Sequence, residues 1–300
     1  MSIRNNEDRT GERRIAAGQP PPQQTVEPES SGTPVKALDF TCPTEFVDLP
    51  SKGRFYPEGH PLHNEDSLEI RFMTAKDEDI LTSKSLLKKG IAIDRFLQNV
   101  IVNKKISVTD LTVGDKNALV VASRITGYGA AYDTKVTCPL CTEAQEFKFD
   151  LNDSKINEGG VQSLQDSEHE AAEGATETDH GTWTVVCPKT GVTVELRLLT
   201  GANEKHMLKT QAMRKKQKLP ESLLTDQLRQ IIVSVNGDAS QPTINKFINV
   251  MPASDSRFVR GAYDKLMPNL DLTQQFECHS CGFEQEMEVP FTTDFFWPKR

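Results

Sequence analysis

Alternation of polar and apolar side chains, which is typical of strands with one buried face, marks several short segments of the chain. At 67–72 the order is Ser, Leu, Glu, Ile, Arg and Phe, so every second side chain is apolar. The segments 183–186 and 192–198 are also strand-like, and a turn at 188–191 joins them. The patterns predict strands at 67–72, 147–151, 183–186, 192–198 and 283–289.

Apolar side chains spaced three and four residues apart predict helices in two regions of the chain. Thr74 is expected to cap the first helix, because the Asp77 carboxylate can accept free backbone amides there. Gly90 follows two lysines and is expected to end that helix. The predicted helices are 74–90, 93–101, 115–125, 205–218, 224–235, 243–250 and 254–266.

Two parts of the chain have compositions that do not favour a packed core. Residues 1–37 are rich in Gln, Pro, Ser, Gly and charge, which predicts a disordered tail. Residues 153–180 carry eight acids and one lysine, so they hold most of the net charge of −8. The predicted regions are 1–37 (disordered tail), 38–133 (strands, then helices), 134–151 (first hairpin), 152–181 (flexible acidic insertion), 182–271 (strands and a second helical region) and 272–300 (second hairpin and aromatic C-terminus).

Four cysteines form two Cys-x-x-Cys turns that lie far apart in the chain, each beside strand-like sequence. Such turns aim two thiolates at one point, and two turns supply the four soft ligands that tetrahedral zinc prefers. The sequence predicts one structural zinc site in a split zinc ribbon. Four thiolates leave no open position for water, which argues against catalysis by the metal. The predicted ligands are Cys138, Cys141, Cys278 and Cys281.

Other interpretations of these cysteines are two redox dithiols, or surface thiols that never meet. A thioredoxin-like dithiol is disfavoured because neither pair begins a helix in a βαβ unit. His279 lies inside the second turn and is interpreted as an exposed bystander. Cys42 and Cys187 are interpreted as inert or buried thiols rather than as further ligands.

Motifs of the common enzyme classes are missing from the sequence. It contains no phosphate-binding loop, no Gly-x-Ser-x-Gly elbow and no His-Glu-x-x-His. The acids at 77–79 are interpreted as a helix start, and the basic residues at 214–218 as a solvated helix end. We therefore expect no enzyme activity and no small-molecule substrate. The aromatic residues 295–297 are expected to pack back on the protein or to contact a neighbouring subunit.

The longest apolar runs are too short to span a membrane, and the N-terminus lacks the apolar core of a signal peptide. The six cysteines are too few for a disulfide scaffold. A soluble protein made in a reducing cytoplasm, without membrane partners, is the expectation from these features.

Segments 49–57, 73–82 and 294–298, together with the two cysteine turns, resemble the baseplate hub proteins of T4-like contractile-tailed bacteriophages. The resemblance runs from about residue 45 to the end and leaves out the tail and the acidic insertion. It implies a non-enzymatic part of the tail baseplate, either permanent or an assembly factor that leaves. It also implies phage baseplate or tail proteins as partners. The implied location is the virion tail baseplate, or the host cytoplasm during assembly.

Two further function classes compete with a structural role. A nucleic-acid-binding zinc ribbon needs basic and aromatic side chains on its strands, whereas Glu284, Glu286 and Glu288 share one face of the predicted last strand. A metalloenzyme needs an open ligand position. The expected fold is α+β, a mostly helical body with a split zinc-ribbon-like β-hairpin module.

Overall fold

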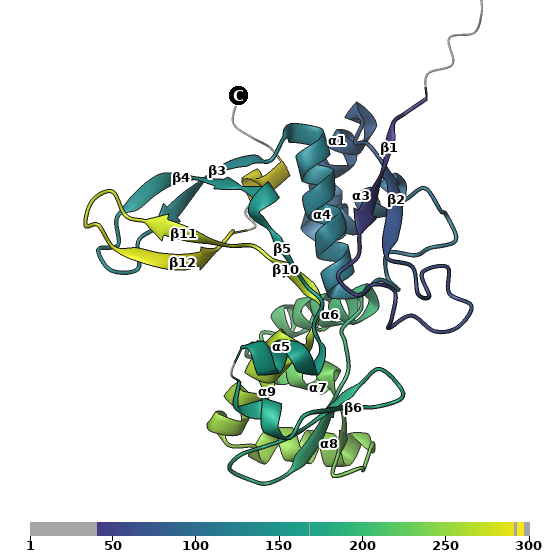
Figure 1. Ribbon diagram of the computed structural model, residues 1–300, viewed down its shortest axis with the longest axis vertical. Helices are drawn as coiled ribbons and strands as arrows, with labels where there is room; N and C mark the ends of the chain where they lie inside the picture. The colour runs from purple at the N-terminus through teal and green to yellow at the C-terminus, as the bar shows by residue number, and fades with distance from the viewer. Residues whose placement is uncertain (1–40, 168, 291–292, 297–300) are drawn as a thin grey trace, which may run out of the picture. The chain divides into compact units, whose positions relative to one another are not determined.

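The computed structural model describes residues 41–167, 169–290 and 293–296 (Figure 1). Contacts separate residues 1–41 from a unit of residues 42–300, and the described helices and strands all belong to this second unit. The predicted tail at 1–37 and the side chain of Trp297 lie outside the described residues. Among the described helices, none is both long and apolar enough to cross a membrane.

Helices and small antiparallel sheets together make the fold α+β, as predicted. The helices are α1 (Ala75–Thr82), α2 (Lys84–Lys89), α3 (Ala92–Val100), α4 (Val113–Tyr128), α5 (Gly160–Asp166), α6 (Gly201–Lys216), α7 (Leu223–Ile231), α8 (Gln241–Val250) and α9 (Ala253–Leu266). Short 3-10 helices are η1 (Leu151–Asp153), η2 (Glu170–Glu173) and η3 (Thr293–Phe296).

All strand pairs described in the structure are antiparallel. The pairs are β1 (Thr44–Asp48) with β2 (Ser67–Arg71), β3 (Ala131–Thr137) with β4 (Ala144–Asp150), β5 (Lys155–Asn157) with β10 (Asn269–Asp271), and β11 (Thr273–Glu277) with β12 (Glu284–Glu288). A four-stranded sheet has the order β6 (Thr176–Glu177), β7 (Trp183–Val186), β8 (Thr193–Leu196) and β9 (Ile232–Val235).

Two clusters of buried apolar side chains form the cores. The first joins β1, β2, α1, α3 and α4 to the hairpins β3–β4 and β11–β12 and to η3. In α3, Phe96, Leu97 and Val100 are fully buried, because their spacing puts them on one helix face. The second core lies around the four-stranded sheet and α5, α7, α8 and α9, and it includes the fully buried Trp183.

The predicted helix at 74–90 is two helices, because Ser83 adopts an extended conformation that ends α1 and begins α2. The Thr74 cap with its Asp77 partner forms as predicted, and so does the left-handed cap at Gly90. The predicted helix at 224–235 is wrong at its end. Its last four residues form β9, where β-branched side chains pair with β8.

The segment 152–181, predicted as a flexible acidic insertion, contains secondary structure. It contains β5, α5, η2 and β6, and Leu164 of α5 is fully buried in the second core. At Gly159, with φ of 68°, an added Cβ would lie 2.4 Å from the Leu266 carbonyl oxygen. A few apolar residues are enough to hold this segment in place, because β10 pairs with β5 and α9 offers a surface on which α5 packs.

Candidate metal centre

Two turns of the same construction close the hairpins β3–β4 and β11–β12. In the first, the Cys138 amide donates to Glu143 O at 2.9 Å, and the Thr142 amide donates to Cys138 O at 2.9 Å. In the second, the Cys278 amide donates to Phe283 O at 2.9 Å, and the Gly282 amide donates to Cys278 O at 2.8 Å. Thr142 and Gly282 are both left-handed, with φ of 61° and 66°. The local sequence therefore builds two matching thiol-presenting turns.

The four sulfur atoms of these turns lie within 4.8 Å of one another. The Sγ atoms of Cys138 and Cys281 are 3.8 Å apart, and those of Cys141 and Cys278 are 3.6 Å apart. Tetrahedral zinc with bonds of about 2.3 Å places its sulfur ligands about 3.8 Å apart. Disulfide sulfurs would be separated by about 2.0 Å, so the arrangement fits a shared metal ion and not disulfides.

The interpretation of these cysteines as surface thiols that never meet is therefore wrong. Two of them, Cys138 and Cys278, are buried in the first core, while Cys141 and Cys281 are exposed. Hydrogen bonds from the backbone amide of Cys141, and then from that of Leu140, lower the pKa of the Cys138 thiol. Despite a backbone hydrogen bond at Phe283, desolvation and the neighbouring thiols raise the pKa of the Cys281 thiol to about 12. The thiolate is the form that binds metal, so metal binding would release protons from this cluster.

Glutamine side chains hold the two hairpins together beside the sulfurs, and Figure 1 shows the hairpins next to each other. Gln145 donates to Glu277 O at 2.9 Å and accepts from the His279 amide at 2.9 Å. Gln274 reaches in the other direction and bonds both the amide and the carbonyl of Asp150. The side-chain amides of Gln145 and Gln274 thus make the backbone hydrogen bonds that a neighbouring strand would make. The two hairpins are linked in this way although they are separate two-stranded sheets.

A series of aromatic rings runs from the cysteine turns into the first core. The Phe147 ring lies 5.3 Å from that of Phe276 across the hairpins, and 4.8 Å from that of Phe149. Tyr132 contacts Phe149 on one side and Phe295 on the other. Phe296 then lies 5.5 Å from Phe96 of α3. Edge and tilted contacts of this kind stabilise a core beyond the area they bury.

The aromatic C-terminal segment packs back on the protein, as predicted for Phe295 and Phe296. Their side chains are only 2% and 3% exposed. Arg124 of α4 is buried and donates from its guanidinium to the carbonyls of Phe295, Gly129 and Ala131. No sequence pattern indicated this role for Arg124, because a lone arginine in a helix carries no local sign of burial.

The turn between β7 and β8 repeats the hydrogen bonds of the two cysteine turns. The Cys187 amide donates to Val192 O, the Gly191 amide donates to Cys187 O, and Gly191 is left-handed. Thr190 occupies the place of the second cysteine. The carboxylate of Asp255 accepts from the Lys189 and Thr190 amides at 3.0 and 3.1 Å, and from the Thr190 hydroxyl. This third turn is held by a carboxylate, and Cys187 is a buried thiol as predicted.

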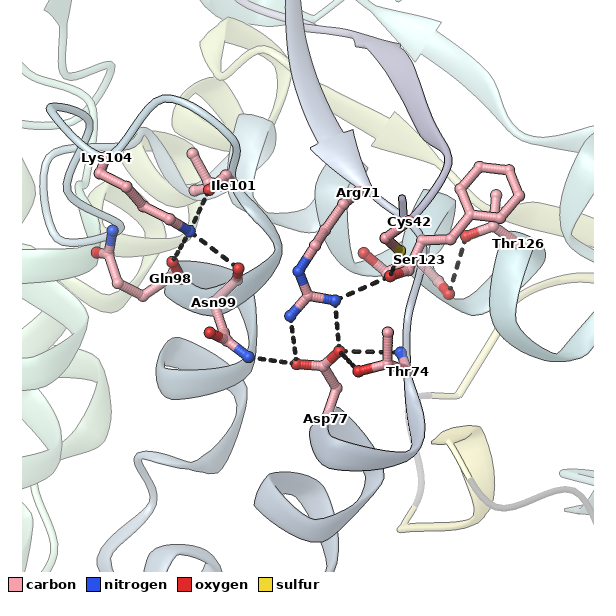
Figure 2. A network of polar contacts seen from close by, with 11 residues as sticks. Cys42, Arg71, Thr74, Asp77, Gln98, Asn99, Ile101, Lys104, Ser123 and Thr126 are labelled. Atoms are coloured by element: carbon pink, nitrogen blue, oxygen red, sulfur yellow. Dashed lines mark hydrogen bonds and ion pairs between the residues drawn. The ribbon is translucent and has the colours of Figure 1, made fainter. Parts of the chain in front are cut away.

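The remaining candidate residues lie away from the four sulfurs or play no part as ligands. His279 is exposed, and the Cys42 thiol donates to Phe72 O. Asp77 is fully buried and accepts hydrogen bonds from Arg71, Thr74 and Asn99 (Figure 2). Although burial raises the pKa of Asp77, the hydrogen bonds led by Arg71 lower it to about 2. The acids at 77–79 therefore begin a helix, as predicted, with Asp77 as a structural anchor.

Comparison with protein families supplies the family of the chain. Residues 43–297 match the family model described as T4 bacteriophage base plate protein. The chain belongs to this family. Neither the curated proteins nor the solved structures gave a match.

Membership of the base plate family confirms the resemblance at the level of a T4-like phage baseplate protein. It implies a place in the virion tail and contacts with other tail or baseplate proteins. The matched range also runs through 152–181, which the resemblance had left out. This agrees with the packing of that segment on α9 and β10.

Proposed function

We propose that this base plate protein is a non-enzymatic structural or assembly component of the baseplate hub, made rigid by zinc at Cys138, Cys141, Cys278 and Cys281. The observation that supports the proposal best is the convergence of four thiols from two distant turns. The facing cysteines are 137 residues apart in the chain for Cys141 and Cys278, and 143 residues apart for Cys138 and Cys281. A part that must hold its shape among moving neighbours gains from such a link. The family membership supports the setting.

Zinc suits this set of donors because it prefers tetrahedral thiolate ligands and needs no redox partner. Closing a flexible loop of this length costs about 4 kcal/mol in chain entropy. Structural zinc contributes about 10–16 kcal/mol at neutral pH, which exceeds that cost. A metal ion can therefore hold the two hairpins together. The direct polar contacts between them include the hydrogen bonds of Gln145 and Gln274.

The metal proposal is tested by elemental analysis of the purified protein. We expect about one zinc per chain, and far less after Cys141→Ser or Cys278→Ser. The matched control is Cys42→Ser, an exposed cysteine away from the cluster, which should keep its zinc. Full zinc content together with unchanged thermal stability in Cys278→Ser would sink the proposal.

The place in the phage is tested by mass spectrometry of purified virions and of baseplate intermediates. Presence in virions in fixed copy number supports a permanent part. Presence in intermediates but not in virions supports an assembly factor. Baseplates that assemble normally in phage lacking the gene, with the protein missing from both samples, would overturn either role.

The nucleic-acid-binding alternative gains no support from the hairpins. Glu284, Glu286 and Glu288 are exposed on one face of β12, where they would repel phosphate. The proposed role therefore remains structural.

A further inference from the structure

Large apolar side chains remain exposed around α6. Six of the twelve exposed large apolar residues in the described ranges lie on α2, on α6 or between α6 and the start of α7. Each is between 46% and 53% exposed. These residues are Leu87, Leu208, Met213, Leu219, Leu223 and Leu224. Four of them, Leu87, Leu208, Leu219 and Leu223, line one depression. Such clustering marks an interaction surface, whereas scattered apolar residues do not.

The surface around α6 is hollowed. One depression of about 640 Å³ extends from Leu87 and Leu208 to Leu219 and Leu223. A second of about 600 Å³ extends from the same two leucines to Ile93. Both are also lined by Gly90 and Gln211, so the two depressions adjoin, and together they are called the α6 groove.

Helix α6 itself is poorly covered by the rest of the chain. It has 16 residues, and only Gly201 is buried. A helix on the surface of a globular protein normally buries an apolar stripe. The Leu208 side chain lies beside Gly90 at the end of α2, where an added Cβ would be 3.8 Å from it. Leu208 of α6 therefore lines the depressions with about half of its surface exposed.

The rim of the first depression is basic, whereas the second has equal numbers of acids and cations in its lining. The first depression is lined by five cationic residues, Lys88, Lys89, Arg214, Lys215 and Lys218, against one acid, Glu221. Arg214 already faces Asp226 at 3.6 Å. Among the described residues, the four lysine ammonium groups have no hydrogen bond or ion pair. The rim therefore offers positive charge to an incoming partner.

We propose that the α6 groove binds an acidic amphipathic α-helix of another protein. The apolar face of that helix would contact Leu87, Leu208 and Leu219, and its carboxylates would face the rim lysines. The groove is lined by helices and their connections and offers no open strand edge, so an extended peptide would leave its own backbone amides unpaired. A helix satisfies its backbone internally, and a concave surface fits a helix better than a flat bilayer.

A model peptide provides the first test. The probe is an 18-residue stapled helix with Leu at one face and Glu at its flanks, compared with a scrambled peptide of the same composition. Fluorescence anisotropy should show binding whose affinity falls as salt is added. The affinity should be lower by about tenfold or more in Leu208→Glu. The matched control is Val250→Glu, an exposed apolar position on α8 outside the groove, which should bind normally.

Three results would overturn the proposal. They are equal binding of the scrambled peptide, unchanged binding by Leu208→Glu, and Leu208-dependent binding to phosphatidylglycerol vesicles in place of the peptide. Because position 208 is about half exposed, Leu208→Glu should fold, and its thermal denaturation checks this.

Photo-crosslinking in the assembled phage tail gives an independent readout. A benzophenone amino acid at position 208 should form an adduct with an acidic helical segment of another tail protein. The same group at position 250 should not form that adduct. Adducts at position 208 that are confined to basic or strand segments would contradict the proposal. This outcome does not depend on zinc, so it can fail while the proposed function stands.

Discussion

Three buried aspartates anchor helix starts to other elements of the chain. Asp77, Asp115 and Asp255 each occupy the third position of a helix and are fully buried. Asp115 accepts from the Ser51 amide and hydroxyl and from the Tyr56 hydroxyl. Asp255 accepts from the β7–β8 turn. A buried carboxylate is tolerated only with such partners, so each one fixes the start of its helix against the segment that supplies the donors.

Asp77 should make the protein sensitive to acid. Its pKa is lowered to about 2, so its stabilisation is present above about pH 4 and is lost as pH falls toward 2. We expect Asp77→Asn to lower the free energy of unfolding by about 2 kcal/mol at pH 7. Urea denaturation should show the wild type and the variant converging between pH 4 and pH 2. Asp79→Asn, at an exposed position of the same helix, should change stability little.

Gln145 should tune the metal centre without touching the metal. Its side chain positions the second cysteine turn through Glu277 O and the His279 amide. Groups that orient ligands typically change metal affinity by about 10–100-fold when removed. Titration of Gln145→Ala with a competing chelator should show a loss in that range. The control is Gln275→Ala, whose side chain bonds the exposed Glu286, and an equal loss there would contradict the role of Gln145.

At the scale of elements, three hairpin turns share one backbone design and differ in what closes them. The turns at Cys138 and Cys278 converge on each other through thiols, whereas the turn at Cys187 is closed by the Asp255 carboxylate from α9. In each turn the residue in the left-handed conformation lies four positions after the first cysteine. Gly282 has open space around it, so glycine favours this turn through its conformation rather than through close packing, whereas Thr142 adopts the same conformation in the first turn without that advantage.

Asp255 should stabilise its turn independently of the metal. We expect Asp255→Asn to lower the free energy of unfolding by about 2 kcal/mol, because three donors would lose a charged acceptor. Zinc content, measured on the same sample, should stay unchanged. Loss of zinc in this variant would show that the third turn and the metal centre are not separate.

At the scale of the molecule, the chain has two cores, and the two buried cysteines of the cluster belong to the first one. Cys138 and Cys278 pack with the aromatic rings that lead to α3, whereas Trp183 and the four-stranded sheet form the second core. This division predicts that loss of the metal lowers the local stability of the first core more than that of the second.

If the four cysteines hold zinc as proposed, its removal by a chelator should loosen the first core before the second. Hydrogen exchange followed by mass spectrometry should show protection falling in β3, β4, β11 and β12. Protection in β7, β8 and β9 should stay near its value with zinc. An equal fall in both sets of strands would contradict the division, and Cys278→Ser should reproduce the effect without chelator.

The features that the sequence determined by itself are those set by neighbouring residues. The cap of α1 at Thr74, the end of α2 at Gly90 and the two cysteine turns follow from local backbone preferences and short hydrogen bonds. The apolar spacing of α3 and the exposed acidic face of β12 were predicted for the same reason. Alternation and helical periodicity report which side of an element is buried.

Only the tertiary structure decided what those elements pack against. It converted 232–235 into a strand beside β8, ordered 152–181 against β10 and α9, and buried Arg124 under the C-terminal segment. The meeting of the two cysteine turns was predicted from their matching motifs, but the contacts that hold them, Gln145 and the Phe147–Phe276 ring pair, appear only in the tertiary structure. The β5–β10 pair and the burial of Arg124 depend on residues more than a hundred positions apart, so no local pattern contains them.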